Sequence, residues 1–359
     1  MDKLVDNFQR VFFRADASIQ IGSGHVMRCL ALANALKIFG IESHFICRKV
    51  SGGMLQQIQD QGHIVHSFFI NESLKDNAWE LDAKICREIL HEIHPDWVVV
   101  DHYELDIRWE KIIKTCCAKL MVIDDLANRL HDCDILLDQT LGRSPEMYAE
   151  LTPEHCILLL GTKYALLRSD FAQLREYSLK RREAGKLEHL LISMGGSDPH
   201  NITQKVLSVL DNSCLPRQCK ITIILGAQFS AVEQIKKQAA NMLWETNILC
   251  NVSNMAEIMA NADLAIGAAG STSWERCCLG LPGLVIILAD NQREVARNLV
   301  LKNAIHVLEL NQFFSKDLHQ KMIAMTERIQ LVNMSRAAAS IVDGLGAKAV
   351  MKVMGIKHV

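Results

Sequence analysis

Short runs of apolar and β-branched residues, each ending in polar residues, recur along the chain and alternate with amphipathic stretches. In the first half these runs are VFFRAD, SHFICR, WVVVDHY, LMVIDD, DILLDQ and CILLLG. Between them, Val26–Phe39 has helical periodicity and is closed by Gly40, and Ala78–Ile93 has the same periodicity and stops before Pro95. Strands and helices that alternate in this way predict a parallel sheet wound by right-handed crossovers.

The same alternation starts again in the second half. The stretch 168–187 is charged and lacks strand signals, which is typical of a solvated helix leading to an interdomain connection. It is followed by HLLISMGG, KITIILG, TNILC, ADLAIGAAG, LVIIL and AIHVLEL. We therefore predict two doubly wound, Rossmann-like α/β domains, residues 1–167 and 188–359, joined by a linker over 168–187. Ligands of such sheets bind beyond the carboxyl ends of the strands, so we expect the substrate in a cleft where the two domains face each other. The last helix of the chain is a candidate to pack back on the first domain.

Length and composition agree with this picture and narrow the class of protein. At 359 residues the chain is longer than one hydrophobic core usually organises. The 39 Lys and Arg residues nearly balance the 41 Asp and Glu residues, so no strong positive field favours a nucleic acid. The N-terminus has no apolar segment of signal-peptide length, and runs such as LVIILA are too short to span a bilayer. We expect a cytoplasmic protein that neither binds nucleic acid nor inserts into a membrane.

The cysteines are typical of reduced, buried thiols rather than of disulfide bonds or metal sites. The chain has 12 cysteines, but no C-x-x-C motif occurs. Cys116 and Cys117 are direct neighbours in the sequence, and so are Cys277 and Cys278. Neither a disulfide framework nor a zinc ribbon has the spacing that it needs.

Three glycine-bearing junctions each follow an expected strand and open an expected helix. They are GSGH at 22–25, MGGSDPHN at 194–201 and GAAGSTSWE at 267–275. A helix start offers unpaired N–H groups and the positive end of the helix dipole, and glycine lets an anion approach them closely. The first junction departs from the dinucleotide fingerprint because Met27 stands at its last glycine, and no P-loop motif occurs. We expect a phosphate-bearing small molecule, with no nicotinamide or other cofactor.

Two of these junctions lie in the C-terminal half, which suggests one ligand that touches both. Ser271 and Thr272 offer hydroxyl groups to a phosphate, and the carboxylate of Glu275 suits a pair of vicinal hydroxyls such as those of a ribose. In the alternative interpretation, Ser271 caps the helix and Glu275 complements its dipole. The residues alone leave both open.

The first junction differs because it carries His25. Imidazole titrates near neutral pH, and a helix N-terminus disfavours its charged form, so this histidine is placed to act as a base that activates water. A histidine that only makes a local hydrogen bond is the alternative. The other histidine cluster, HEIH at 91–94, departs from the H-E-x-x-H motif and is typical of a solvated helix end.

Acidic and aromatic residues follow two strands of the first domain. Asp101 and Tyr103 come directly after a buried run, where a pocket residue is plausible. Asp124 and Asp125 follow the next run, and such a pair either binds a divalent metal or caps the following turn. No metal site is predicted.

Several of these segments together resemble a known family. They are RADASIQIGSGHVMRCLALA, VVVDHYELD, MVIDDLANR, MGGSDPHN and GAAGSTSWERCCLGLPGLVIILADNQ. In order and over nearly the whole chain they resemble the UDP-2,4-diacetamido-2,4,6-trideoxy-β-L-altropyranose hydrolases of pseudaminic acid biosynthesis. The wider kin of that family are GT-B nucleotide-sugar glycosyltransferases of the MurG type. The resemblance implies two facing Rossmann-like domains and a hydrolase in which water attacks the anomeric carbon, inverts it and releases UDP.

The resemblance also implies roles for particular residues. The catalytic base falls on His25. Substrate-binding positions of the first domain fall on Arg14, Asp16, Gly22, Gly24, Asp101 and Tyr103. Those on the phosphate side of the second domain fall on Gly195, Gly196, Ser197, Gly270, Ser271 and Thr272. Glu275 would take the ribose hydroxyls, uracil would lie near Leu249–Met255 with Met255 as a contact, and Asn291 and Gln292 would reach the sugar or the diphosphate.

Two other functions compete with the hydrolase. The first is a glycosyltransferase of the MurG type, which would move the sugar from UDP to an acceptor other than water. The second is a nucleotide-sugar sensor or a subunit of a larger complex, which would need no base at the position of His25. We expect a stand-alone hydrolase, because no acetyltransferase or cytidylyltransferase segment is appended.

Overall fold

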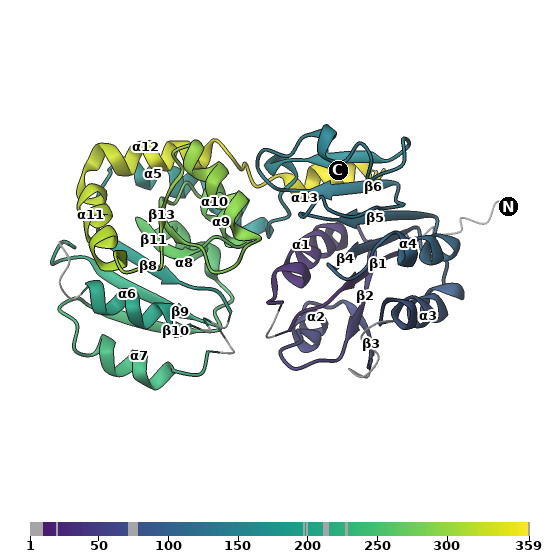
Figure 1. Ribbon diagram of the computed structural model, residues 1–359, viewed down its shortest axis with the longest axis horizontal. Coiled ribbons are helices and arrows are strands. Elements are labelled where there is room, and N and C mark those ends of the chain that lie inside the picture. The colour runs from purple at the N-terminus through teal and green to yellow at the C-terminus, as the bar shows by residue number, and fades with distance from the viewer. Residues whose placement is uncertain are drawn as a thin grey trace. The chain divides into compact units, whose positions relative to one another are not determined.

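A computed structural model describes residues 10–18, 21–70, 78–196, 198, 200–210, 215–226 and 229–357. The chain divides into two compact units (Figure 1). Unit 1 comprises Met1–Arg168 and Leu345–Val359, and unit 2 comprises Ser169–Gly344. Each unit has its own parallel sheet, so the predicted fold class of two Rossmann-like α/β domains is confirmed.

Unit 1 holds a seven-stranded sheet in the order β3-β2-β1-β4-β5-β6-β7. The strands are β1 (Arg10–Ala15), β2 (Glu42–Arg48), β3 (Ile64–Phe68), β4 (Trp97–Asp101), β5 (Lys119–Ile123), β6 (Ile135–Asp138) and β7 (Ile157–Leu160). The α-helices are α1 (Gly24–Ile38), α2 (Leu55–Asp60), α3 (Ala78–His91), α4 (Ile107–Ile113) and α13 (Gly346–Val353). Short 3-10 helices lie at η2 (Lys114–Cys116), η3 (Pro145–Met147) and η4 (Thr162–Tyr164).

Both faces of the unit 1 sheet are buried under helices. Successive side chains of a strand point to opposite faces, and Phe12 and Phe13 accordingly belong to different hydrophobic clusters. The cluster around Phe13 includes α1 and α13, and the cluster around Phe12 includes α3 and α4. This double burial explains why the strands read as nearly continuous apolar runs.

Unit 2 holds a six-stranded sheet in the order β10-β9-β8-β11-β12-β13. The strands are β8 (His189–Ser193), β9 (Lys220–Leu225), β10 (Thr246–Cys250), β11 (Leu264–Ala268), β12 (Gly283–Ile286) and β13 (Ile305–Leu308). The helices are α5 (Ser169–Arg182), α6 (Ile202–Leu210), α7 (Val232–Ala239), α8 (Met255–Asn261), α9 (Thr272–Cys278), α10 (Gln292–Leu301), α11 (Phe314–Thr326) and α12 (Arg328–Ala339).

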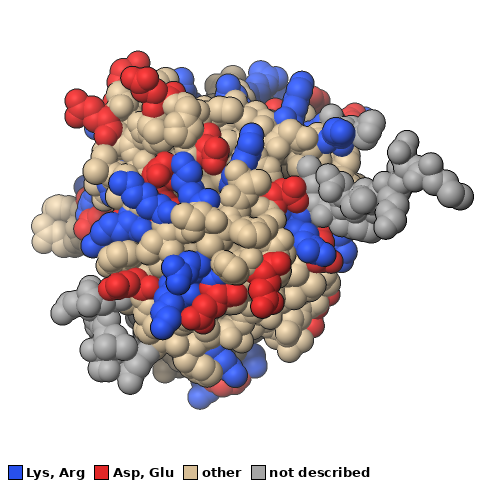
Figure 2. Space-filling view, turned by 90° about the vertical axis from the view of Figure 1, so that its right-hand side faces the viewer, with Lys and Arg blue, Asp and Glu red and all other residues tan. Residues whose placement is uncertain are grey.

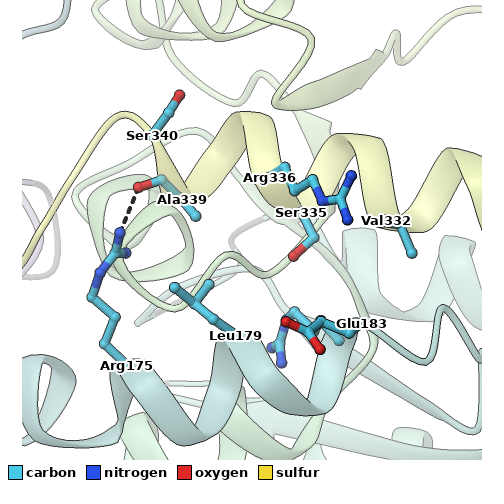
Figure 3. Close-up of a pocket in the computed structure, with 9 residues that line it drawn as sticks. Arg175, Leu179, Glu183, Val332, Ser335, Arg336, Ala339 and Ser340 are labelled. Carbon is cyan, nitrogen blue, oxygen red and sulfur yellow. Dashed lines mark hydrogen bonds between the residues drawn. The ribbon is translucent and has the colours of Figure 1, made fainter.

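The segment expected to be a solvated helix in the connection between the domains is helical, but it belongs to unit 2. Most of 168–187 is the helix α5, whose side chains bond to the ends of other unit 2 helices. Nη2 of Arg175 donates to the carbonyl of Ala339 at 2.7 Å, and Nη2 of Arg182 donates to that of Met259 at 2.7 Å. A pocket of about 300 Å³ lies between α5 and α12 (Figure 3). Thus α5 is an integral part of unit 2.

The last helix, the candidate to pack back on the first domain, belongs to unit 1, so the second unit ends before residue 359. Residues after Gly344 belong to unit 1, where the yellow α13 lies among elements of the first half of the chain (Figure 1). Val350 and Met351 of α13 are buried in the same cluster as Leu36 of α1. The chain therefore enters unit 2 after Arg168 and returns to unit 1 at Leu345.

Each sheet has one point at which the strand order reverses direction. In unit 1 this point lies between β1 and β4, and in unit 2 it lies between β8 and β11. The connections leave these two strands toward opposite sides, which opens a crevice at their carboxyl ends, the usual ligand position in doubly wound sheets. His25 and Asp101 come after β1 and at the end of β4, and the glycine junctions of unit 2 come after β8 and β11.

The surface has mixed charge. Lys and Arg side chains are interspersed with Asp and Glu side chains on the face in Figure 2, as the nearly balanced composition predicts. Among the described helices, none is both long enough and apolar enough to cross a bilayer.

Candidate active site

A tight turn brings His25 to the start of α1. The backbones of Ser18 and Gly22 bond to each other in both directions, at 2.9 and 3.3 Å. Gly22 has a φ of +75°, in the left-handed region that favours glycine. The helix begins at Gly24, so His25 is its second residue and follows directly after the turn that Gly22 shapes.

A carboxylate from the neighbouring strand holds His25. Nδ1 of His25 lies 2.6 Å from Oδ1 of Asp101. Burial alone would raise the pKa of Asp101, but Arg28 and His25 outweigh it and hold that pKa below its ordinary value. The carboxylate is therefore ionised and can only accept, so Nδ1 donates its proton to Asp101, with Nη2 of Arg28 at 3.2 Å from the same nitrogen. When the ring is neutral, Nε2 then has the lone pair. An imidazole in this tautomer is able to take a proton from water.

The structure changes the expected role of Asp101. We expected it to contact substrate, but Asp101 is only 1% exposed and its carboxylate is occupied by His25 and Arg28. The strand register explains the pairing, because Asp101 lies opposite Ala15 at the end of β1. Asp101 therefore orients His25.

Arg28, which is absent from the predicted site, completes this group. Its Nε and Nη2 donate to the two carboxylate oxygens of Asp101 at 2.5 and 2.6 Å, and its Nη1 donates to Asp125 at 2.9 Å. The signal that could have found it is its position three residues after His25, a spacing that puts two side chains on one face of a helix. Arg28 fixes Asp101 as Asp101 fixes His25.

Tyr103 packs against the imidazole. Its ring meets that of His25 edge to face, with centroids 4.5 Å apart and an interplanar angle of 86°. His25 is 7% exposed, and Tyr103 is half-buried. Of the residues that the sequence assigns to the first domain, the structure thus brings His25, Asp101 and Tyr103 together beside Gly24.

Arg14 and Asp16 lie in a separate buried network. Arg14 is fully buried and donates to Asp16 at 2.7 and 2.8 Å and to Asp82 at 2.6 Å. Asp16 also accepts from the backbone N–H of Arg48 at 2.7 Å and lies 3.1 Å from Nε2 of His102. We expected Arg14 and Asp16 to contact substrate. Because both are enclosed and paired, we correct that expectation and assign them to holding the end of β1 in place.

The Asp124–Asp125 pair, which the sequence leaves open between metal ligand and turn cap, has protein partners. Oδ2 of Asp124 accepts from the N–H of Ala127 at 2.8 Å and from the hydroxyl of Tyr148 at 2.9 Å. Asp125 accepts from Arg28. Asp124 therefore caps the following turn. Over the described part of the chain, no three His, Cys, Asp or Glu side chains gather into a candidate metal site.

In unit 2, the turn after β8 exposes Gly195 and Gly196. Gly195 has a φ of +91°, and a Cβ added to either glycine would meet nothing within 4 Å. Ligand atoms can therefore approach the backbone of this turn closely. Ser197, which we also expected at this site, lies outside the described residues.

Two features of this turn were not predicted. Asp198 caps α6, since its carboxylate accepts from the N–H groups of Ile202 and Thr203 at 2.8 and 2.9 Å, so an anion would find those two donors occupied. Gly226 lies behind the turn, where a Cβ would come within 1.9 Å of the carbonyl oxygen of Gly196. Among the described residues of this turn, the backbone of Gly195 and Gly196 is exposed.

The turn after β11 presents hydroxyl groups. Ser271 is exposed at the N-cap position of α9, and its side chain makes no capping hydrogen bond. Thr272 is half-buried and accepts from Nη1 of Arg276 at 3.3 Å. Glu275 is partly exposed in the first turn of α9, a place that suits either ribose hydroxyls or the helix dipole. One interpretation of the sequence is that the side chain of Ser271 caps the helix, and the structure does not have this hydrogen bond.

The remaining predicted residues lie in loops of unit 2. Asn291 is exposed at the N-cap position of α10, and Oε1 of Gln292 accepts from the N–H of Leu288 at 2.9 Å. Met255 opens α8 after the β10 loop. Because β8, β11 and β12 are neighbours in a parallel sheet, their carboxyl ends bring Gly196, Gly270 and Asn291 to one edge. Met255 belongs to the same edge farther along, because β10 is two strands from β8.

Comparisons with known proteins agree with this architecture. Residues 190–351 match the glycosyltransferase family 28 C-terminal domain. A crystal structure of MurG from Acinetobacter baumannii has a TM-score of 0.72 and 15% identity, and the likeness covers 97% of this chain and 99% of that one.

Two curated relatives are similar in sequence. The UDP-2,4-diacetamido-2,4,6-trideoxy-beta-L-altropyranose hydrolase of Campylobacter jejuni is 26% identical over 82% of this chain and 97% of its own length. An uncharacterized protein of Methanocaldococcus jannaschii is 29% identical over 78% of this chain, and the match spans only 56% of that longer relative. The chain thus shares the two-domain fold of MurG, matches the glycosyltransferase family 28 C-terminal domain over residues 190–351, and is similar in sequence to the Campylobacter jejuni hydrolase.

Proposed function

We propose that this chain is an inverting UDP-sugar hydrolase. It would convert UDP-2,4-diacetamido-2,4,6-trideoxy-β-L-altropyranose and water into UDP and the free sugar, a cytoplasmic step of pseudaminic acid biosynthesis. The observation that carries the proposal is the 2.6 Å pair of His25 and Asp101, which leaves Nε2 as a base at the switch point of unit 1. The name of the 26% identical relative supports the choice of substrate.

The reaction needs one base and a stable leaving group. Nε2 of His25 would take a proton from water as the water oxygen attacks C1. The bond from C1 to the diphosphate oxygen would break on the opposite face, and its electrons would leave with UDP, so that C1 is inverted. UDP is a good leaving group, so a general acid is less necessary than for an alcohol. Asp101 would stabilise the imidazolium that forms.

Unit 2 would hold the UDP part of the substrate. The exposed backbone of Gly195 and Gly196 and the hydroxyls of Ser271 and Thr272 would contact the diphosphate. The other contacts carried over from the family motif are Glu275 with the ribose, Met255 near the uracil, and Asn291 and Gln292 with the sugar or diphosphate. No cofactor enters this scheme.

A glycosyltransferase is the second candidate, favoured by the family 28 domain at 190–351. It would use the same UDP site but would need an acceptor hydroxyl in place of water. The two candidates differ in whether UDP is released when the UDP-sugar is the only substrate.

The experiment is to incubate the purified protein with the UDP-sugar alone and follow UDP and the free sugar by NMR. We expect UDP release without an added acceptor, and the first sugar anomer to have the opposite configuration at C1. Release that begins only when a sugar or lipid acceptor is added would identify a transferase. Binding of the UDP-sugar without any turnover would favour the sensor.

His25→Ala tests the assigned base. We expect a loss in kcat on the order of 10²–10⁴-fold with UDP affinity retained, because only the proton acceptor is removed. His91→Ala is the matched control, since His91 is an exposed histidine at the end of α3 in the same unit. Equal turnover by the His25→Ala variant and the wild type would exclude His25 as the base.

A further inference from the structure

Arg276 of α9 is a buried cation that forms no ion pair with a described side chain, although the charge of Glu275 beside it offsets part of the cost of burial. It is 4% exposed, and none of the ion pairs among the described residues includes it. Its Nη2 donates to the carbonyl of Ala268 at 2.9 Å and to the hydroxyl of Ser273 at 3.0 Å, and its buried Nε has no partner. Burial lowers the pKa of Arg276, because the charge is costly there.

Two other buried arginines, Arg14 and Arg28, each pair with two aspartates. Arg182 is closer to Arg276, because burial lowers its pKa to about 9 and its Nε has no partner. Its other nitrogens donate to the carbonyls of Met259 and Ala260 near the end of α8, where carbonyl groups concentrate negative partial charge. Arg276 instead reaches toward Thr272, at the beginning of its own helix, where N–H groups concentrate positive partial charge.

Gly267 makes room for this guanidinium. A Cβ at Gly267 of β11 would lie 3.3 Å from Nη1 of Arg276, and Nη2 of Arg276 reaches the carbonyl of Ala268 at the end of the same strand. The cation therefore lies against the carboxyl half of the sheet, directly behind the turn that carries Ser271 and Thr272.

The bond to Thr272 has a consequence for the outer side of the turn. Nη1 of Arg276 donates to Oγ1 of Thr272 at 3.3 Å, so one lone pair of the hydroxyl is occupied and its hydrogen has to point elsewhere. Thr272 is partly exposed. Its hydroxyl can therefore donate a hydrogen bond to an acceptor outside the turn. The hydroxyl of the exposed Ser271 beside it can do the same.

We infer that Arg276 is a positioning residue for the diphosphate of the nucleotide: it fixes the hydroxyl of Thr272 as an outward donor and supplies, from behind the turn, a positive charge that no ion pair among the described residues neutralises. The inference rests on the proposed UDP site of unit 2, but not on hydrolysis. It predicts that Arg276 discriminates UDP, which carries the diphosphate, from uridine, which does not.

The test compares Arg276→Met and Arg276→Lys in the full chain, with UDP and uridine titrated by calorimetry. A unit charge several ångströms from an anion in a partly buried site supports an effect on the order of 10–100-fold. We expect Arg276→Met to weaken UDP binding by that factor and to change uridine binding less than about threefold. Arg276→Lys keeps the charge and should restore part of the UDP affinity. Arg336→Met, an exposed arginine of α12, is the matched control and should bind both as the wild type does.

Thr272→Val provides a second, independent variant. It removes the hydroxyl but leaves Arg276, and combined with Arg276→Met it should weaken UDP binding by less than the product of the two single effects. Equal losses for UDP and uridine, or unchanged UDP binding by Arg276→Met, would overturn the inference, as would a wild type that does not bind UDP. A wild type that binds UDP with this discrimination but does not hydrolyse the UDP-sugar would refute the hydrolase and leave the role of Arg276 intact.

Discussion

At the scale of single residues, the sequence indicates His25 and Asp101 as site residues, but not that they contact each other or that Arg28 joins them. His25 stands at a glycine turn that opens a helix, a local pattern that reads directly from the chain. Asp101 is 76 residues away, and only the register of β1 with β4 brings the two together. Arg14 and Asp16 look like site residues because they share the motif, yet they are buried as a structural ion pair.

Asp101→Asn tests the support of the base. An amide at this position no longer offers two ionised oxygens, so His25 loses the partner that fixes its tautomer and stabilises its cation. We expect kcat to fall by about 10²–10⁴-fold, with UDP affinity unchanged. The free energy of unfolding should fall too, because Arg28 keeps only Asp125 as an acidic partner.

The measurements for this variant are steady-state kinetics, UDP titration and denaturant unfolding. Asp106→Asn is the control, since Asp106 is an aspartate of the same unit that caps α4. A variant with wild-type kcat would show that Asp101 has only a structural role.

At the scale of elements, burial decides what the sequence reveals. Strands covered on both faces, such as β4, read as apolar runs and were predicted. The edge strand β3 was missed because it contains His66 and Ser67 and is mostly accessible, so it has no apolar run. Helix α5 was taken for a linker because its contacts are made by arginines, whose polar heads bond to carbonyls while the residues look solvated in sequence.

The turn after β8 leads to a prediction at this scale. In Gly226→Ala, the added Cβ would overlap the carbonyl of Gly196, so the turn has to move away from the end of β9. We expect UDP affinity to fall by at least about tenfold, because a misplaced contact of roughly 1 Å has effects of this order or larger.

Titration with UDP and thermal unfolding measure the effect of Gly226→Ala. The matched control is Gly283→Ala in β12 of the same unit, where the nearest atom to a Cβ is a side-chain carbon at ordinary contact distance, 3.4 Å. Wild-type UDP affinity in Gly226→Ala would mean that the turn after β8 does not touch the nucleotide.

At the scale of the whole molecule, buried histidines link stability to pH. Burial lowers the pKa of His63 to about 4, with the charge of Lys37 adding to the effect. Burial also lowers the pKa of four others, namely His66, His102, His189 and His306. In the unfolded chain their pKa is about 6.5, so below that pH the unfolded state binds more protons than the folded state.

The free energy of unfolding should therefore fall as the pH is lowered from about 6.5 toward 4. The aspartates with lowered pKa, such as Asp101, begin to contribute to this loss only below about pH 4. Denaturant unfolding at several pH values checks the prediction, and His63→Gln should make the slope shallower. Constant stability between pH 7 and 5 would contradict it.

The return of the chain to unit 1 at α13 gives the molecule two covalent crossings, one after Arg168 and one before Leu345. In the order of the sequence, unit 2 is thus inserted between two segments of unit 1. A single cut at either crossing leaves both units attached through the other. Unit 2 can be exchanged for a related domain only as the whole segment 169–344, and a protein fused to the C-terminus is attached to the unit that carries His25.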